Sequence, residues 1–357
     1  MPPLAPTATE ILPPVTALDP GPGASISLVV PDGSPALPTL HDVFLARRVV
    51  ARHLPPTPLL QPPALADRLG CDLYVKCENL QPIGAFKIRG GLYLLSQLSP
   101  AERARGVVTA STGNHGQSIA YAARAYDTQA TIFVPEGANP LKVAAIHRLG
   151  AEVVVAGADF DASFAAAERH AAIQGATFVH PANEPRLIAG VATYSLEIIE
   201  AVPDLDVLIV PIGGGSGLSG ACIAAKGINP KLRLIGVQAA GAPAVHDAWR
   251  QRQMVTLDRA ETFAEGLATR VSHTLPARII WERIDDIRLV SDADMRRAIV
   301  TLLETTRLLA EGAGAAAFAA AEAMRDELAG LKVAIVLSGG NLTLDGLAAA
   351  LAMEHAR

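Results

Sequence analysis

Short runs of β-branched and aliphatic residues alternate with longer helical patterns along this chain of 357 residues, starting near Leu40. A strand followed by a helix and another strand predicts parallel strands with helices on both faces of the sheet, so we expect an α/β protein. The expected strands cover residues 73–77, 107–109, 130–134, 153–155, 207–211, 232–237 and 333–337. The expected helices cover residues 117–126, 140–149, 163–173, 190–201 and 294–310, the last with a capping box from Ser291 to Asp294.

The first 38 residues differ from the rest in composition. They contain ten prolines, which disfavour a helix or a central strand. We therefore predict an extended Pro-rich N-terminal arm over residues 1–38, ahead of the folded body.

Composition excludes several classes of protein. Hydrophobic residues make up 50% and charged residues 18%, which is typical of a folded globular chain. A net charge of −5 gives no sign of binding to nucleic acid or to a membrane surface. No apolar run is long enough to cross a bilayer, and the first basic residue is Arg47, so we expect a cytoplasmic protein without a secretory signal. Cys71, Cys77 and Cys222 lack metal-ligand spacing and are expected to be buried, reduced thiols.

Four glycine-rich segments follow expected strands, at the sheet edge where open parallel sheets bind ligands. The first, residues 78–91, places Lys87 between Phe86 and Ile88. We expect a helix to begin near Ala85, with Lys87 close to its start. Burial among apolar neighbours lowers the pKa of an amine, which suits Schiff-base chemistry. A solvated surface lysine is the alternative.

The second segment runs through Ser111-Thr112-Gly113-Asn114-His115, after the strand at 107–109. Backbone N–H groups and hydroxyls before a helix suit an anion such as a carboxylate. The alternative is an ordinary helix cap made by Ser111 or Thr112. We read His115 as structural and not as a catalytic base.

The other two segments follow later strands. Residues 213–220 are rich in glycine and precede a helical pattern, which suits a phosphate cradle built from backbone N–H groups. They match neither a Walker A loop nor a clean dinucleotide fingerprint, and a flexible loop is the alternative. The last segment, residues 338–341, begins with Ser338, a neutral donor and acceptor at a strand end.

In this order the segments resemble those of the fold type II pyridoxal-phosphate enzymes, and most closely the serine/threonine dehydratase and serine racemase group, over about residues 40–350. The resemblance implies pyridoxal 5'-phosphate as cofactor and a small amino acid as substrate. It implies a tryptophan synthase β-like fold of two open, mainly parallel sheets flanked by helices. A small mobile domain, residues 106–183, is inserted in a large cofactor-binding domain, residues 39–105 and 184–357. Members are usually oligomeric, so we expect a homodimer or homotetramer.

The resemblance also implies residue roles. Lys87 holds the cofactor as a Schiff base and acts as general base, forming a catalytic set with Ser111 and Asn114. Asn114 contacts the ring hydroxyl and Ser338 faces the ring nitrogen. The implied cofactor-binding residues are Phe86, Lys87, Asn114, Gly213, Gly214, Gly215, Ser216, Gly217 and Ser338. The implied substrate-binding residues are Ser111, Thr112, Gly113, Asn114 and His115.

The implied activity is that of a lyase, a dehydratase that converts a β-hydroxy amino acid such as L-threonine or L-serine to a 2-oxo acid and ammonia. We expect no C-terminal regulatory domain of the kind that biosynthetic threonine dehydratases carry, so the shorter, catabolic type of dehydratase is the better match. Racemisation, β-replacement and non-catalytic binding stay open as alternatives. The Ser338-Gly339-Gly340-Asn341 ending favours the dehydratases, and Lys87 argues against a non-catalytic protein.

Three departures from the family pattern matter. Ser216 stands where the phosphate loop usually has a fourth glycine, and its hydroxyl can donate to a phosphate. Thr112 stands where racemases carry a serine that acts as second acid/base and where many dehydratases carry alanine. Racemase-like members bind a divalent cation after the strand that here ends near Gln238, but residues 238–244 include no carboxylate, so no metal is expected.

Overall fold

The computed structural model describes residues 35–354, so residues 1–34 of the expected N-terminal arm lie outside the described residues. The strands are β1 Leu59–Leu60, β2 Asp72–Cys77, β3 Val107–Ala110, β4 Ala130–Val134, β5 Glu152–Val155, β6 Thr177–Phe178, β7 Val207–Pro211, β8 Arg233–Ala239, β9 Asp286–Val290 and β10 Lys332–Leu337. The helices are α1 Leu40–Val50, α2 Pro63–Leu69, α3 Ile88–Ser96, α4 Pro100–Arg105, α5 Asn114–Ala125, α6 Pro140–Arg148, α7 Phe160–Gln174, α8 Pro185–Val191, α9 Thr193–Ala201, α10 Ser216–Ile228, α11 Ala244–Gln251, α12 Thr274–Ile280, α13 Asp292–Thr306, α14 Gly312–Ala323, α15 Arg325–Leu328 and α16 Leu344–Glu354, with 3-10 turns η1 Glu78–Leu80 and η2 Glu265–Leu267.

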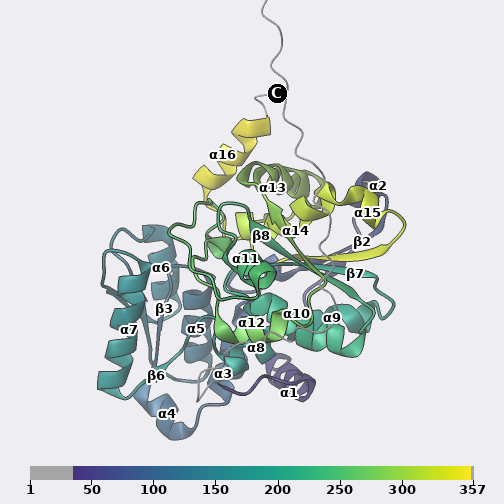
Figure 1. Cartoon of the computed structure of the whole chain (residues 1–357). Coiled ribbons are helices and arrows are strands. Elements are labelled where there is room, and N and C mark those ends of the chain that lie inside the picture. The colour runs from purple at the N-terminus through teal and green to yellow at the C-terminus, as the bar shows by residue number, and fades with distance from the viewer. Residues whose placement is uncertain (1–34, 355–357) are drawn as a thin grey trace, which may run out of the picture.

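The strands form two sheets. A six-stranded sheet has the order β1-β2-β10-β7-β8-β9, and only β1 is antiparallel to its neighbour. A four-stranded, wholly parallel sheet has the order β5-β4-β3-β6 and lies beside the larger one with α5, α6 and α7 (Figure 1). The predicted α/β fold of two mainly parallel sheets is confirmed. The division at residues 106–183 and the mobility of that part stay predictions.

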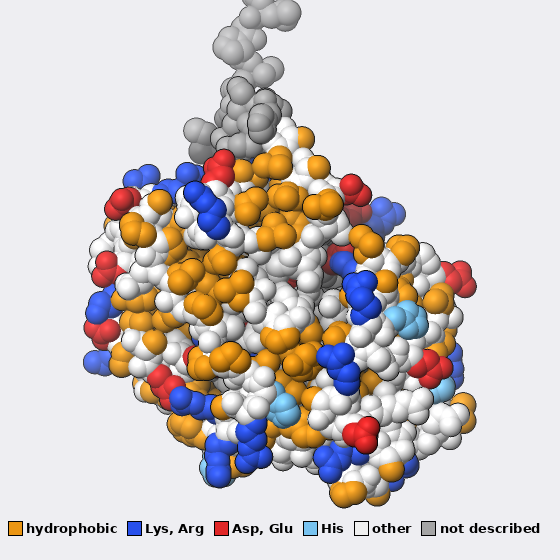
Figure 2. Space-filling view, turned by 180° about the vertical axis from the view of Figure 1, so that it is seen from behind, with side chains coloured by type: hydrophobic (Ala, Val, Ile, Leu, Met, Phe, Trp, Pro, Cys, Tyr) orange, Lys and Arg blue, Asp and Glu red, His pale blue; other side chains and the backbone are white. Residues whose placement is uncertain are grey.

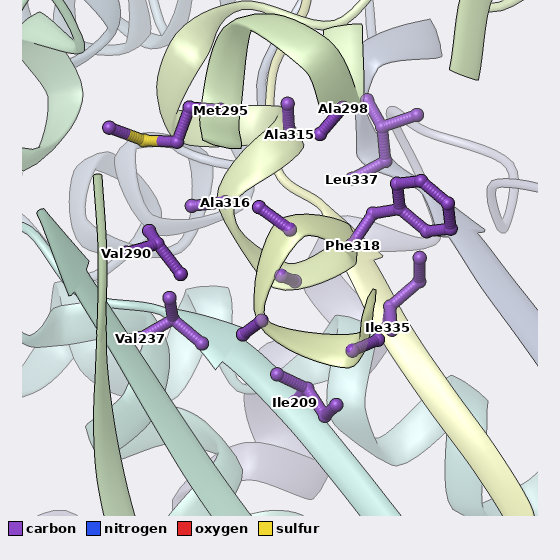
Figure 3. Close-up of a cluster of buried hydrophobic side chains, with 14 of the residues drawn as sticks. Ile209, Val237, Val290, Met295, Ala298, Ala315, Ala316, Phe318, Ile335 and Leu337 are labelled. Atoms are coloured by element: carbon purple, nitrogen blue, oxygen red, sulfur yellow. The ribbon is translucent and has the colours of Figure 1, made fainter. Parts of the chain in front are cut away.

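Alternating strand residues pack on opposite faces of the six-stranded sheet. Ile209, Val237 and Ile335 pack toward α14, whereas the neighbouring residues of the same strands join a second cluster with α9, α10 and α12. Ten of the 12 residues of α14 are alanine or glycine, and such small side chains let its backbone approach the sheet closely, with Phe318 filling the remaining space (Figure 3). This helix begins beside the loop that follows β10, so it also brings its first residues to the carboxyl edge of the sheet.

The seven expected strands are confirmed, and β1, β6 and β9 were not expected. The helix expected to begin near Ala85 begins later, although Lys87 does lie at its start, as expected. The helix α3 begins at Ile88, because Ala85 instead pairs with Gly339 across the sheet edge. The helical pattern at 190–201 belongs to two helices, α8 and α9, that meet at Ala192. The capping box of Ser291 is confirmed.

Figure 2 shows patches of hydrophobic side chains on the face turned away in Figure 1, among scattered charged groups. Among the described helices, none combines the length and hydrophobicity needed to cross a membrane. The three cysteines are buried and unpaired, as expected.

Candidate active site

The first and last glycine-rich segments meet at the carboxyl edge of the six-stranded sheet. The backbone N–H of Phe86 donates to the carbonyl of Ser338 at 3.0 Å, and the N–H of Gly340 donates to the carbonyl of Gly84 at 2.9 Å. These bonds hold Lys87, the residue before α3, beside the end of β10. Two segments that are far apart in sequence therefore build one edge of the site.

The amine of Lys87 lies against the third segment. Its Nζ donates a hydrogen bond of 2.8 Å to Oγ of Ser216 and lies 5.4 Å from the centre of the Phe86 ring. Burial lowers the pKa of Lys87 to about 8, because removal from water disfavours the charged form. Roughly a tenth of this amine is therefore unprotonated at pH 7, far more than for an ordinary lysine, and Schiff-base formation requires this free amine.

Two positions of the glycine-rich loop leave no room for a side chain. A Cβ added to Gly213 would lie 2.1 Å from the carbonyl oxygen of Gly266. Gly215 has a φ of 97°, in the left-handed region, and a Cβ there would lie 2.8 Å from Cβ of Pro276. The helix α10 starts at Ser216, so its first N–H groups open onto this loop. The loop and the adjacent Lys87 fit the phosphate and the aldehyde of pyridoxal phosphate, respectively.

Ring-packing residues adjoin this loop. Phe86 packs on Tyr194 in an edge-on contact of 5.8 Å between ring centres. A Cβ on Gly217 would lie 3.3 Å from the Phe86 ring, so the ring lies directly on the start of α10. Ser338 is buried, and its Oγ makes only a long contact of 3.4 Å to the carbonyl of Ala313. Its hydroxyl thus keeps hydrogen-bonding capacity for a ring nitrogen.

Asn114 lies at the start of α5 and contacts a residue that sequence reasoning missed. Its Nδ2 donates to Oε1 of Glu311 at 2.7 Å, and its Oδ1 accepts from Nδ2 of Asn341 at 2.8 Å. Burial raises the pKa of Glu311. The only sequence signal for Glu311 is a lone carboxylate before an alanine-rich helix, and nothing local connects it with Asn114.

The loop before α5 places Ser111 at the end of β3. Its Oγ accepts a hydrogen bond of 3.2 Å from the N–H of Gly113, which forms a local turn. Gly113, the residue before α5, has open space where a Cβ would stand. Thr112 lines a cavity of about 810 Å³ together with Lys142 and Glu265, which form an ion pair across it.

Hydrogen bonding determines which nitrogen of His115 carries a proton. The hydroxyl of Thr109 donates to the carbonyl of Val179 at 2.7 Å, so the same oxygen accepts from Nε2 of His115 at 3.0 Å. The Nδ1 atom is then an acceptor, and it is buried without a partner among the described residues. Burial, with the nearby charge of Lys87, lowers the pKa of His115 to about 3. It is therefore neutral at neutral pH and a weak base.

Two further histidines lie next to the phosphate loop and were missed by sequence reasoning. A Cβ on Gly214 would lie 3.7 Å from Nε2 of His273, whose ring meets that of His180 edge-on at 5.2 Å. Burial lowers the pKa of both histidines to about 4. The Nδ1 of His180 accepts from the backbone N–H groups of Ala182 and Asn183, so its Nε2 carries the proton.

A buried ion network anchors the helix that carries Lys87. The guanidinium of Arg89 donates to Glu78 twice at 2.8 Å, to Glu197 at 2.6 and 2.8 Å, and to Thr193 at 3.1 Å. Lys76 also donates to Glu197, at 2.6 Å. Arg89 and Glu78 are fully buried, so every donor of the guanidinium has a protein acceptor and the start of α3 is held firmly.

The region of the family's cation site has no carboxylate. Gln238 is fully buried, and its Oε1 accepts from the N–H groups of Val245 and His246 at 3.1 and 2.8 Å. Within residues 35–354, no three His, Cys, Asp or Glu side chains gather as a metal site would need. The expectation that no metal binds stays a prediction.

Comparison with known proteins gives one family. The family model described as "Pyridoxal-phosphate dependent enzyme" matches residues 50–339. An L-threonine ammonia-lyase of Geobacter sulfurreducens is 40% identical over 287 residues, which cover 80% of this chain and 71% of that protein. An L-threo-3-hydroxyaspartate ammonia-lyase of Saccharomyces cerevisiae is 35% identical, covering 86% and 94%, and a serine racemase of Schizosaccharomyces pombe is 34% identical, covering 87% and 96%.

Solved structures give the same fold. The processed form of threonine deaminase isoform 2 from Solanum lycopersicum superposes with a TM-score of 0.83 at 28% identity, covering 92% of this chain and 98% of that one. Serine racemase from Dictyostelium discoideum superposes with a TM-score of 0.81 at 33% identity, covering 87% and 100%. The tryptophan synthase β-like arrangement of two sheets expected from the motifs is therefore confirmed.

Proposed function

This chain belongs to the family of pyridoxal-phosphate dependent enzymes, in its threonine dehydratase and serine racemase group, and we propose that it is an ammonia-lyase. The proposed reaction converts a β-hydroxy amino acid such as L-threonine or L-serine to a 2-oxo acid and ammonia. The observation that carries the proposal is the Lys87 amine, with a pKa of about 8, hydrogen-bonded to Ser216 at the glycine-rich loop. The names of the relatives, ammonia-lyases acting on threonine and hydroxyaspartate, support the reaction class.

The proposed cofactor site follows from the geometry. The backbone N–H groups of residues 213–217 and the hydroxyl of Ser216 would bind the phosphate, while Phe86 and Ser338 would contact the ring. Lys87 would hold the aldehyde carbon. Bound pyridoxal phosphate supplies an electron-withdrawing ring that stabilises negative charge at the carbon bearing the substrate amine.

The protein's own groups complete the reaction. With substrate bound, the amine of Lys87 would take the proton from the α-carbon as general base, which its lowered pKa allows. Ser111 and the N–H groups of Thr112, Asn114 and His115 bind the substrate carboxylate at the start of α5, while the N–H of Gly113 donates to Ser111. His115 stays neutral and holds this loop through Thr109. Loss of the β-hydroxyl as water and hydrolysis then give the 2-oxo acid and ammonia.

Racemisation is the second candidate, because serine racemases are among the relatives. Thr112 stands where racemases carry a serine and offers a hydroxyl beside the cavity. Its branched side chain has fewer rotamers than serine, which disfavours a second proton transfer. β-Replacement has no specific contact in its favour.

Assay of the purified, cofactor-loaded protein separates these reactions. We expect 2-oxo acid and ammonia in equal amounts from L-threonine, L-serine or L-threo-3-hydroxyaspartate. Chiral chromatography of the remaining amino acid reports racemisation. Formation of the D-isomer without oxo acid would refute the ammonia-lyase assignment, and absence of both products with all three substrates would refute the substrate class.

We also propose that the chain assembles as a homodimer or homotetramer in the cytoplasm and that residues 106–183 close over the substrate. Exposed apolar side chains such as Phe44, Leu45 and Ile228 favour association. Sedimentation equilibrium tests the assembly, and a monomer at all concentrations would contradict it.

A further inference from the structure

The carboxamide of Asn114 is held at both ends by the protein. Its nitrogen donates to the Glu311 carboxylate and its oxygen accepts from Asn341. A flipped amide would place oxygen against the carboxylate and nitrogen against the Asn341 amide, which loses both hydrogen bonds. The two partners therefore determine the orientation of Asn114, and one of the two N–H groups on Nδ2 has no acceptor among the described hydrogen bonds.

The held amide lies where the cofactor-site segments meet. Asn341 donates from the same Nδ2 atom to the carbonyl of Ile83 at 2.8 Å, within the segment that carries Lys87. A Cβ on Gly339, the residue after Ser338, would lie 3.3 Å from Nδ2 of Asn114 and 2.4 Å from Oε1 of Glu311. Only glycine at 339 leaves this space, so the loop is shaped around the Asn114–Glu311 pair.

The position of Glu311 suits an acceptor. It precedes α14, where the exposed N–H groups of a helix favour negative charge, and its backbone N–H donates to the carbonyl of Gly339 at 3.0 Å. A carboxylate is a stronger acceptor than a neutral group, so it polarises the amide that donates to it. Asn114 starts a helix that packs on the four-stranded sheet, whereas Glu311 precedes α14, which packs on the six-stranded sheet, and Asn341 follows strand β10 of that sheet. The hydrogen bond between Asn114 and Glu311 therefore also joins the part of the molecule built on the four-stranded sheet to the part built on the six-stranded sheet.

We infer that Glu311 is a positioning residue: with Asn341 it orients the Asn114 carboxamide so that the remaining N–H is presented to the ring of pyridoxal phosphate. The inference rests on the proposed function only for the identity of the cofactor. Glu311 acts through Asn114 and does not itself react with substrate.

A double-mutant cycle on cofactor binding tests the inference. Pyridoxal phosphate is titrated, without amino acid, into apoprotein of the parent, Glu311→Ala, Asn114→Ala and the double variant, and visible absorbance reports binding. We expect each single change to weaken binding about tenfold, as for a hydrogen bond to a charged group. The double variant should be no more than about twofold weaker than Asn114→Ala, because the two residues act as one unit. Glu322→Ala, at the far end of α14 and paired with Arg68 at the surface, is the matched control and should bind like the parent.

Two results would overturn the inference. Glu311→Ala could weaken binding by the same factor with and without the Asn114 amide, or it could lower the apoprotein unfolding midpoint without changing cofactor affinity. If Glu311→Ala does not fold, Glu311→Gln enters the same cycle and should show a smaller loss that again disappears in the Asn114→Ala background. If the parent protein binds the cofactor but forms no 2-oxo acid, the ammonia-lyase proposal is refuted. The double-mutant cycle still tests the role of Glu311, because it measures cofactor binding alone.

Discussion

Replacing Arg89 by methionine should destabilise the fold strongly. The change removes a fully buried guanidinium that donates to Glu78, Glu197 and Thr193. Glu78 is then left buried without its cation, and breaking a buried ion pair from one side costs about 3–5 kcal/mol. That is a large part of the roughly 5–15 kcal/mol that stabilises a typical domain.

Urea unfolding of the apoprotein at pH 7.5, followed by circular dichroism, measures this loss. The matched control is Arg68→Met, which breaks the ion pair of Arg68 with Glu322, whose side chains are 54% and 23% exposed. That change should cost less than about 1 kcal/mol, because solvent screens surface pairs. Equal losses for Arg89→Met and Arg68→Met would refute the account of the network.

The pH dependence of the folding stability tests the same ion pair between Arg89 and Glu78. Burial alone would raise the pKa of Glu78, but the charge and hydrogen bonds of Arg89 outweigh it and hold the pKa below its ordinary value. Its contribution to stability is therefore present above the unfolded pKa and is lost as pH falls through the folded one. In Arg89→Met the Glu78 pKa should instead rise, so this variant should lose less stability relative to the parent at pH 5.5 than at pH 7.5. A constant difference across that range would contradict the reasoning.

Three more predictions concern the site. Ser338→Ala should weaken pyridoxal phosphate binding by about 1–2 kcal/mol, measured by titration of the apoprotein, and an unchanged affinity would show that Ser338 does not face the ring. EDTA should leave activity intact in a steady-state assay, because Gln238 stands where a carboxylate ligand is expected, and a loss reversed by magnesium or calcium would contradict this. In the apoprotein, the rate at which an amine reagent labels Lys87 should rise with pH through about 8, since the lowered pKa frees the amine there; a midpoint above pH 10 would contradict the burial argument.

Local patterns in the sequence were enough to predict most of the strands and helices. The seven expected strands were found because buried parallel strands read as continuous aliphatic runs, as in β4 and β7. The strand β9 was missed because it lies at the sheet edge, and its charged residues Asp286 and Arg288 interrupt the apolar run. The start of α3 was misplaced because the pairing of Ala85 with Gly339 is a tertiary contact.

The site likewise contains features that are visible in the local sequence and features that depend on contacts between distant residues. The lysine and the glycine-rich loop were each visible locally, but the hydrogen bond between Lys87 and Ser216 joins residues 129 positions apart. Glu311 meets Asn114 across 197 positions, and His273 reaches the phosphate loop only through the fold. Sequence reasoning found segments with characteristic composition, and it could not find single residues whose role depends on a distant partner.

The site of cofactor attachment tests the central claim most directly. The purified protein is loaded with pyridoxal phosphate, reduced with borohydride, digested and mapped by mass spectrometry. We predict the phosphopyridoxyl group on Lys87 and no labelled peptide from Lys87→Ala, because this amine combines a pKa of about 8 with a position at the glycine-rich loop. Label on another lysine, such as Lys142, in the parent protein would contradict the account.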